Sequence, residues 1–278
     1  MKQKAIAIIQ ARMSSSRLPG KVLKPLAGKP VIWHIYNRAS RCKLVDKVIV
    51  ATSDEPSDTP LADFCNANGM NVYRGSLDNV LSRYTEILSN EEYLYYVRIT
   101  GDCPLIHPQF IDNQIMALLK FNGDLTWCEN LGTAFGGQGV HSARSLFYIA
   151  DRSNNPLDLE HVGSVFMSDH PEMLRIVEIT PPPTHFVSDK LRLTVDEEND
   201  FLMFSKLYDH LWPQNKWIEL DDAIEFLKKR EDIASINQTV EHKLLNIELQ
   251  EKFKKWQAIK KAGLWEYKQI IPDILSLT

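Results

Sequence analysis

Short apolar runs alternate with helical patterns through the first 121 residues, and this alternation limits the fold more than any other feature of the chain. Runs rich in β-branched and aromatic residues, typical of strands, occupy residues 4–9, 47–52, 71–73 and 94–100. Apolar residues recur at every third or fourth position, as in amphipathic helices, at residues 31–42, 59–68, 79–90 and 108–121. Strands that are apolar on both faces need helices above and below them. The pattern therefore predicts an α/β fold with a Rossmann-like, doubly wound, mostly parallel sheet.

The regular alternation ends near Asp124. Residues 125–145 are rich in glycine and predict a loop or hairpin region. Later patterns predict strands at residues 174–179 and 191–195 and helices at residues 157–168, 200–211 and 220–230. From Val240 onward one long amphipathic helix is expected, with Gly263 as its C-cap. We divide the chain into an α/β domain of residues 1–239, with a small inserted subdomain at about residues 125–185, and a C-terminal helical extension of residues 240–278.

The composition is that of an ordinary globular protein. Hydrophobic residues make up 44% of the 278 residues, charged residues 24%, and the net charge is −4, which argues against a disordered chain and against a duplex-DNA binder. No apolar run is long enough to span a bilayer, and the first one is broken by Gln10 and Arg12, so neither membrane insertion nor a signal peptide is expected. The four scattered cysteines form no Cys-x-x-Cys pair, which favours a cytoplasmic location.

Positive charge is concentrated at the beginning of the chain. The first 45 residues contain ten Lys or Arg and no Asp or Glu, which leaves 22 basic and 36 acidic residues for the remainder. Because this basic block is interleaved with apolar residues, it indicates a folded anion site rather than a disordered arm.

The segment after the first strand has the composition of a phosphate-binding loop. It runs from Gln10 to Lys21 and presents Arg12, three serines and Arg17 where the first strand ends. Ligands of open α/β sheets bind at the carboxyl ends of strands, where loop amides, hydroxyls and cations can contact phosphate oxygens. The spacing matches neither a Walker loop nor a dinucleotide fingerprint. The alternative is a solvated basic turn.

This loop resembles the nucleotide-binding loop of the sugar cytidylyltransferases, which include the CMP-acylneuraminate and CMP-KDO synthetases. The resemblance is greatest to the spore-coat polysaccharide biosynthesis cytidylyltransferase-like branch. Further stretches match that branch in the same order, at residues 50–54, 74–84, 98–106, 160–162 and 192–196. The resemblance covers about residues 5 to 230 and implies a fold of the nucleotide-diphospho-sugar transferase type. It also implies a Mg²⁺-dependent enzyme that joins CMP from CTP to an acidic sugar, or to a related small acceptor such as a phosphorylated or phosphonylated molecule, and releases pyrophosphate. Surface polysaccharide synthesis is the expected context, and a homodimer is the expected assembly.

Two aspartates are candidate metal ligands. Asp102 follows the strand at residues 94–100, and Asp196 follows the strand predicted at residues 191–195. Carboxylates at strand ends can hold Mg²⁺ together with substrate phosphates, and the resemblance implies this role for both. For a Gly-Asp pair such as Gly101-Asp102, a simple turn is the alternative.

The resemblance also implies the other residues of the site. Catalysis is expected to involve Arg12, Arg17, Lys21 and Asp102. CTP is expected to contact Gln10, Ala11, Arg12, Ser14, Ser15, Arg17, Lys21, Thr52, Ser53, Asp54 and Thr100. For Ser53 and Asp54, capping of the next helix is an alternative. A small acidic acceptor is expected to contact Arg74, His141 and His161, of which His141 departs from the family pattern. For Arg74 the alternative is an anchor for carboxylates within the fold, and for His161 it is a structural hydrogen bond.

The acceptor side departs from the related branch. That branch typically has Gly-Leu-Asp-Val-Glu where this chain has Gly137-Gln-Gly-Val-His141, so the usual acceptor cannot be transferred. Two other functions remain open. A sugar-nucleotide-dependent glycosyltransferase would usually show Asp-x-Asp, which the sequence around Asp102 lacks. A non-enzymatic nucleotide-binding protein is the second alternative. Neither a zinc-binding histidine pair nor a basic, aromatic groove for nucleic acid is evident.

Overall fold

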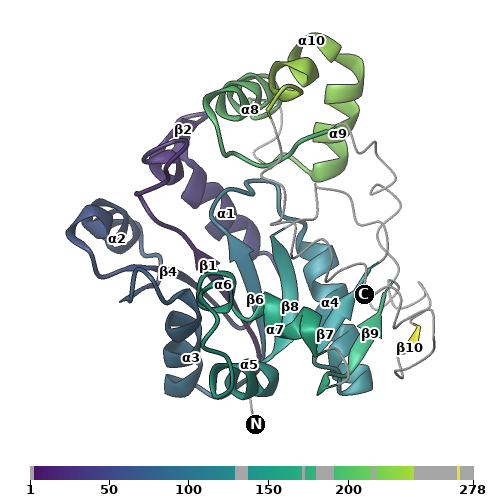
Figure 1. The fold of residues 1–278 in the computed structure, drawn as a ribbon. Helices are drawn as coiled ribbons and strands as arrows, with labels where there is room; N and C mark the ends of the chain where they lie inside the picture. The colour runs from purple at the N-terminus through teal and green to yellow at the C-terminus, as the bar shows by residue number, and fades with distance from the viewer. Residues whose placement is uncertain are drawn as a thin grey trace.

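The computed structural model describes residues 3–128, 137–170, 173–179, 191–213, 217–240 and 268–269, and the structural statements below concern these residues. One mixed sheet lies at the centre, in the strand order β10-β9-β7-β8-β6-β1-β4-β5 (Figure 1). Its strands are β1 (Gln3–Gln10), β4 (Lys47–Ser53), β5 (Val72–Gly75), β6 (Tyr93–Thr100), β7 (Leu125–Trp127), β8 (Gln138–Ser142), β9 (Ile176–Glu178) and β10 (Lys268–Gln269). A separate antiparallel pair is formed by β2 (Pro25–Leu26) and β3 (Lys29–Pro30).

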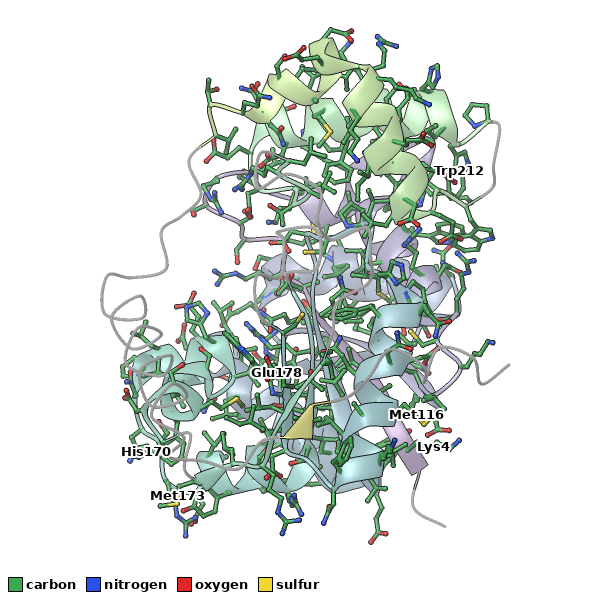
Figure 2. The ribbon with its side chains drawn as sticks, turned by 90° about the vertical axis from the view of Figure 1, so that its right-hand side faces the viewer. Lys4, Met116, His170, Met173, Glu178 and Trp212 are labelled. Atoms are coloured by element: carbon green, nitrogen blue, oxygen red, sulfur yellow. The ribbon has the colours of Figure 1, made fainter. Side chains whose placement is uncertain are left out.

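Helices cover both faces of this sheet and one end of it. They are α1 (Val31–Ala39), α2 (Thr59–Ala67), α3 (Val80–Asn90), α4 (Pro108–Phe121), α5 (Ala143–Ala150), α6 (Pro156–His161), α7 (Ser164–Asp169), α8 (Glu198–Leu211), α9 (Leu220–Lys229) and α10 (Glu231–Ala234). Figure 2 shows Trp212, just after α8, at the opposite end of the molecule from Lys4 in β1. The helices α8, α9 and α10 therefore lie beyond the carboxyl ends of the strands.

Strand direction confirms the predicted mostly parallel sheet. β1 pairs in parallel with β4 and β6, β4 with β5, β7 with β9, and β9 with β10. Among the described strands only β8 runs in the opposite direction, pairing antiparallel with both β6 and β7.

The residues of β1 alternate between two cores, which is why the sheet is covered on both faces. Ala5, Ala7 and Ile9 belong to the larger core, which includes residues of α1, α4 and α8. Ile6 and Ile8 belong to the second core, built mainly with α3 and α5. Successive side chains of a strand point to opposite faces, so an uninterrupted apolar run is what a doubly covered strand requires.

Most predicted elements of the first half are confirmed, while the second half differs in several places. The predicted helix at residues 157–168 is divided into α6 and α7, because Val162 and Gly163 both have positive φ angles of 58° and 79°. β7 and β8 lie within the stretch expected to be a loop or hairpin and pair antiparallel, as hairpin strands do, whereas the helix α5, which begins inside that stretch, was not expected.

The strand predicted at residues 191–195 was wrong. This segment pairs with no described strand, and the backbone N–H of Val195 instead donates to the carbonyl oxygen of Asp102 over 2.8 Å. The long helix expected from Val240 lies almost wholly outside the described residues. Across the described ranges no helix combines the length and apolar character that crossing a bilayer requires.

Candidate active site

A cavity of about 620 Å³ opens at the carboxyl ends of β1 and β6. Most of the residues expected to form the site line it: Gln10, Ala11, Arg12, Ser15, Arg17, Lys21, Thr100, Asp102, His161 and Asp196. They come from the loop after β1, the turn after β6, the end of α6 and the segment before α8. The structure thus brings the basic loop and both predicted metal ligands to one hollow at the sheet edge where α/β proteins bind ligands.

The loops after β1 and β6 touch at Gly101. Its N–H donates to the carbonyl oxygen of Gln10 over 2.9 Å. A Cβ atom at this position would lie 2.9 Å from the Cβ of Ala11 and 3.0 Å from the oxygen of Gln10. Glycine is therefore required here by close approach of the backbone, and the contact fixes Asp102 relative to the basic loop.

Asp58 fastens the beginning of the basic loop. Its fully buried carboxylate accepts from the N–H of Met13 over 2.6 Å through Oδ1. Its Oδ2 accepts from both the N–H and the hydroxyl of Ser53, at the end of β4. At the other end of the loop, the N–H of Gly20 donates to the carbonyl oxygen of Met13 over 2.9 Å. The loop is therefore closed on itself and tied to the sheet.

Lys21 lies between the two predicted metal ligands. Its Nζ is 3.1 Å from Oδ2 of Asp102 and 3.0 Å from Oδ1 of Asp196. Arg17 also contacts Oδ1 of Asp196, at 2.9 Å. The two carboxylates therefore converge on one cation, although Asp102 alone follows a strand and Asp196 follows an irregular segment.

The charges in this cluster shift each other's pKa values. Burial by itself lowers the pKa of Lys21, but Asp102 and Asp196 raise it more, so the net pKa lies above its ordinary value. Burial by itself raises the pKa of Asp196, but Lys21, Arg17 and Arg192 together bring it below its ordinary value. Both groups are charged at neutral pH, and the cavity carries adjacent positive and negative charges.

A buried network holds Asp196 from behind. Arg192 donates from Nη2 to Oδ2 of Asp196 over 2.6 Å and from Nε to Oδ1 of Asp200 over 2.9 Å. Asp200 is fully buried and also accepts from the side chain of Asn237 over 2.9 Å and from the N–H groups of Asp196 and Glu197. This network gives Asp196 a fixed orientation without a β-ladder, which is the kind of support that positions metal ligands.

The donor set of the pair suits Mg²⁺. No group of three or more His, Cys, Asp or Glu side chains arranged for a metal ion occurs in the described part of the chain. Mg²⁺ does not need such a group, because it commonly binds one or two carboxylates together with substrate phosphates and waters. Asp102 and Asp196 provide that number of carboxylates, and Lys21 shows that both reach a single cation.

Several predicted residues lie away from the cavity lining. Ser14 is exposed on the basic loop, and Asp54 is exposed beyond β4. Thr52 and Ser53 are fully buried, and the hydroxyl of Ser53 donates to the Asp58 carboxylate that holds the basic loop. Arg74 donates to the carbonyl oxygens of Ser53 and Glu55 over 3.0 and 2.8 Å, which holds the turn before α2. Contacts of these residues with nucleotide or acceptor stay predictions.

His141 also lies away from the cavity lining. Its ring stacks on Tyr96 with centroids 5.3 Å apart, and its Nδ1 is buried with no hydrogen-bond partner in the described part of the chain. Burial, with Arg98 nearby, lowers the pKa of His141 to about 3. A contact between His141 and an acceptor likewise stays a prediction.

Sequence reasoning missed three charged residues of the cavity wall. Arg83 is 3% exposed, lines the cavity, and donates from Nη1 to the carbonyl oxygen of Ala51 over 3.1 Å. Asp78 and Glu160 line the cavity as well. All three lie in stretches that match the related branch, so the family motifs contained the signal. The helical spacing of Arg83 with Val80 and other inward residues of α3 also places it on the buried face.

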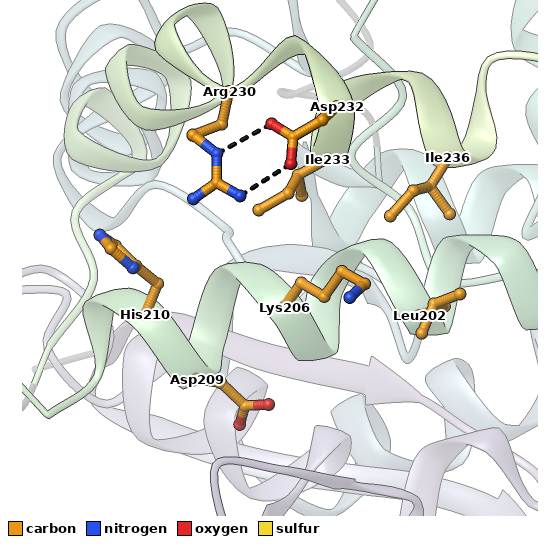
Figure 3. Close-up of a pocket in the computed structure, with 8 residues that line it drawn as sticks. All are labelled: Leu202, Lys206, Asp209, His210, Arg230, Asp232, Ile233 and Ile236. Atoms are coloured by element: carbon orange, nitrogen blue, oxygen red, sulfur yellow. Dashed lines mark hydrogen bonds and ion pairs between the residues drawn. The ribbon is translucent and has the colours of Figure 1, made fainter.

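A second hollow of about 590 Å³ lies between α8 and α10, and Figure 3 shows the residues that line it. It contains the exposed pair of Arg230 and Asp232, and Asp209 points away from that pair. No predicted site residue lines it, so it is not the candidate active site.

Comparison with known proteins agrees with this geometry. A cytidylyltransferase family model matches residues 6–255. Protein MJ1063 of Methanocaldococcus jannaschii is 32% identical over 240 residues, which cover 86% of this chain and 97% of that protein. The spore coat polysaccharide biosynthesis protein SpsF of Bacillus subtilis is 29% identical over 232 residues, which cover 82% of this chain and 95% of that protein.

Solved structures show the same fold. A cytidylyltransferase from Leptospira borgpetersenii superposes with a TM-score of 0.74 at 26% identity, covering 86% of this chain and all of that one. A CMP-2-keto-3-deoxy-manno-octonic acid synthetase bound to CTP superposes with a TM-score of 0.56 at 20% identity, covering 76% of this chain and 99% of that one. The fold is therefore the α/β fold of the nucleotide-diphospho-sugar transferase type. With a family model that spans most of its length, the chain belongs to the cytidylyltransferase family.

Proposed function

We propose that this protein transfers CMP from CTP to an oxygen of a small acidic acceptor and releases pyrophosphate. One observation carries the proposal: a basic loop and two converging carboxylates line one cavity at the carboxyl ends of β1 and β6. Membership of the cytidylyltransferase family supports CTP as the nucleotide. This arrangement suits nucleotidyl transfer, in which catalysis is mainly positioning and stabilisation of charge.

The side chains of the cavity have different roles in the proposed reaction. Arg12, Arg17 and Lys21 bind the triphosphate and stabilise charge on the departing pyrophosphate. Asp102 and Asp196 would hold Mg²⁺, which when bound would neutralise charge on the phosphates and lower the pKa of an acceptor hydroxyl. The acceptor hydroxyl gives up its proton to solvent as its oxygen attacks the α-phosphorus in line. The bond from that phosphorus to the bridging oxygen breaks, and its electrons leave on pyrophosphate.

The acceptor enters from the wall formed by α3 and α6. His161 and Arg83 line the cavity there and offer groups that suit an acidic molecule. The likeness to SpsF, whose name refers to spore coat polysaccharide biosynthesis, supports a role in polysaccharide synthesis, for which we propose an acidic sugar as the acceptor. The proposal includes a homodimer in which the region of about residues 125–185 contributes to acceptor binding and to contact between subunits.

Release of pyrophosphate tests the function. The full-length protein is incubated with CTP and Mg²⁺, first alone and then with nonulosonic and octulosonic acids, and pyrophosphate is measured with an enzyme-coupled assay. Acceptor-dependent release, with CTP preferred over UTP, GTP and ATP, is the expected result. A glycosyltransferase would release a nucleotide from a sugar nucleotide instead, and a binding protein would release nothing; either result contradicts the proposal.

A further inference from the structure

All four oxygens of the carboxylate pair already have partners. Oδ1 of Asp196 contacts Lys21 at 3.0 Å and Arg17 at 2.9 Å, and its Oδ2 accepts from Arg192 at 2.6 Å. Oδ2 of Asp102 contacts Lys21 at 3.1 Å, and its Oδ1 contacts the Sγ of Cys103 at 3.4 Å. A divalent cation held by Asp102 and Asp196 would therefore compete with the cationic side chains that are already there.

The cations around the pair differ in how firmly they are held. Arg192 is 5% exposed and is fixed on its other side by Asp200, so it belongs to the permanent frame. Lys21 and Arg17 belong instead to the basic loop, and 11% and 31% of their side-chain surfaces are exposed. These are the same two side chains that the proposed function assigns to the triphosphate.

We infer that Lys21, assisted by Arg17, occupies the metal position between Asp102 and Asp196 until a polyphosphate draws it away, so that divalent metal and nucleotide bind cooperatively. The inference rests on the proposed function for the role of the polyphosphate. Before nucleotide binds, the ammonium neutralises the two carboxylates and competes with a divalent cation. When phosphates attract the lysine, the carboxylates are freed at the moment when phosphate oxygens can complete the coordination of the metal. Such coupling is reciprocal, so bound metal strengthens nucleotide binding by the same factor.

Metal binding without nucleotide tests this arrangement directly. Mn²⁺ alone is titrated into the full-length protein, and free Mn²⁺ is followed by electron paramagnetic resonance. Lys21→Met keeps the length of the side chain and removes its charge, so it should bind Mn²⁺ roughly ten-fold more tightly than the wild type. Lys24→Met is the matched control, because Lys24 pairs with the exposed Glu198 outside the cavity and should leave Mn²⁺ affinity unchanged.

Two further variants keep the test decisive. Adding Asp102→Asn to Lys21→Met should abolish the gain in Mn²⁺ affinity, which locates the ion at the pair. Arg17→Met, at the more exposed side chain, should raise affinity in the same direction by a smaller factor. Arg17→Met provides the same test if Lys21→Met does not fold. A rise in thermal unfolding midpoint with Mn²⁺ that is larger for Lys21→Met than for the wild type is the second readout.

Equal Mn²⁺ affinity of the wild type, Lys21→Met and Arg17→Met would overturn the inference. A gain that survives Asp102→Asn would also overturn it, because the ion would then bind elsewhere. These measurements use no substrate, so their failure is distinct from failure of the proposed function, which would appear as absence of pyrophosphate release.

Discussion

The backbone N–H of Val195 donates to the carbonyl oxygen of Asp102 over 2.8 Å. This hydrogen bond joins the segment before α8 to the turn after β6 and places Asp196 beside Asp102. The two carboxylates come from distant parts of the sequence, and their meeting at Lys21 depends on this contact and on the Arg192–Asp200 network behind it.

Replacing Asp102 by Asn should abolish useful turnover and preserve the fold. The change removes one of the two carboxylates that face the basic loop and leaves a side chain of the same size. Initial rates of pyrophosphate release should fall by about 10²- to 10³-fold, with an unchanged thermal unfolding midpoint. Asp209→Asn, on the exposed side of α8, is the control and should keep full activity. A fully active Asp102→Asn protein would disprove the metal assignment.

Replacing Lys21 by Ala should weaken binding of the triphosphate. An ionised hydrogen-bond donor contributes about 1.5–3 kcal/mol, so the dissociation constant for CTP should rise about ten-fold or more. Calorimetry in the presence of EDTA measures this without a metal contribution. Lys24→Ala should bind CTP like the wild type, and unchanged CTP affinity of Lys21→Ala would argue against the loop as the phosphate site.

Replacing Asp200 by Ala should destabilise the protein strongly. Asp200 is fully buried, and its loss leaves Arg192 as a buried charge with one partner fewer. The free energy of unfolding should fall by about 3–5 kcal/mol, as measured by urea denaturation. Asp232→Ala, in the fully exposed pair with Arg230, should change stability little. Equal effects of the two substitutions would contradict the structural role of the buried network.

Arg74→Ala separates a structural role from an acceptor role. The side chain donates to the carbonyl oxygens of Ser53 and Glu55 and to the hydroxyl of Thr59, so its loss should lower the thermal unfolding midpoint. The KM for the acceptor identified by the pyrophosphate assay should stay close to that of the wild type. A raised acceptor KM with an unchanged unfolding midpoint would instead support the acceptor contact expected from the sequence.

His34 should make the protein less stable in mild acid. Burial lowers its pKa to about 4, although the hydrogen bond from Nε2 to the carbonyl oxygen of Leu26 works in the other direction. The His34 imidazole takes up a proton near pH 6.5 in the unfolded chain but only near pH 4 in the folded protein. Between these two pH values the unfolded state binds more protons, so the stability of the folded protein falls as the pH falls. The full loss in the free energy of unfolding across this range is about 3 kcal/mol.

Urea denaturation of wild type and His34→Gln across that pH range checks this expectation. The variant should show a shallower loss of stability. Burial also lowers the pKa values of His107 and His141, so part of the slope should remain. Parallel curves for the two proteins would show that His34 is not the group responsible.

The sequence predicted the sheet and the core of the site because both depend on local pattern. The apolar run that becomes β1 and the basic loop after it are contiguous in the chain. Because ligands of α/β sheets bind at the carboxyl ends of the strands, Asp102 at the end of β6 is expected beside Lys21. Asp196 was expected in the right place for the wrong reason. The segment before it forms no strand, because the N–H of Val195 donates to the turn at Asp102 and the side chain of Arg192 donates to Asp200.

The remaining predictions depended on contacts that sequence patterns do not contain. Ser53 and Arg74 lie at strand ends, as ligand-binding residues do, yet Asp58 and the turn before α2 use them as anchors. His141 stacks on Tyr96 because the two residues lie opposite each other in the pairing of β6 with β8, a register that the glycine-rich stretch did not reveal. Arg83 reaches the cavity only because α3 packs beside the end of β4.

The close approach at Gly101 has a consequence for how such proteins diversify. The loops after β1 and β6 share one space, with room for no additional carbon atom between them. An insertion or a bulkier residue in either loop requires a compensating change in the other. We therefore expect the two loops to change together during evolution. The wall built by α3 and α6 lies outside that shared space, so changes there leave the contact between the two loops intact.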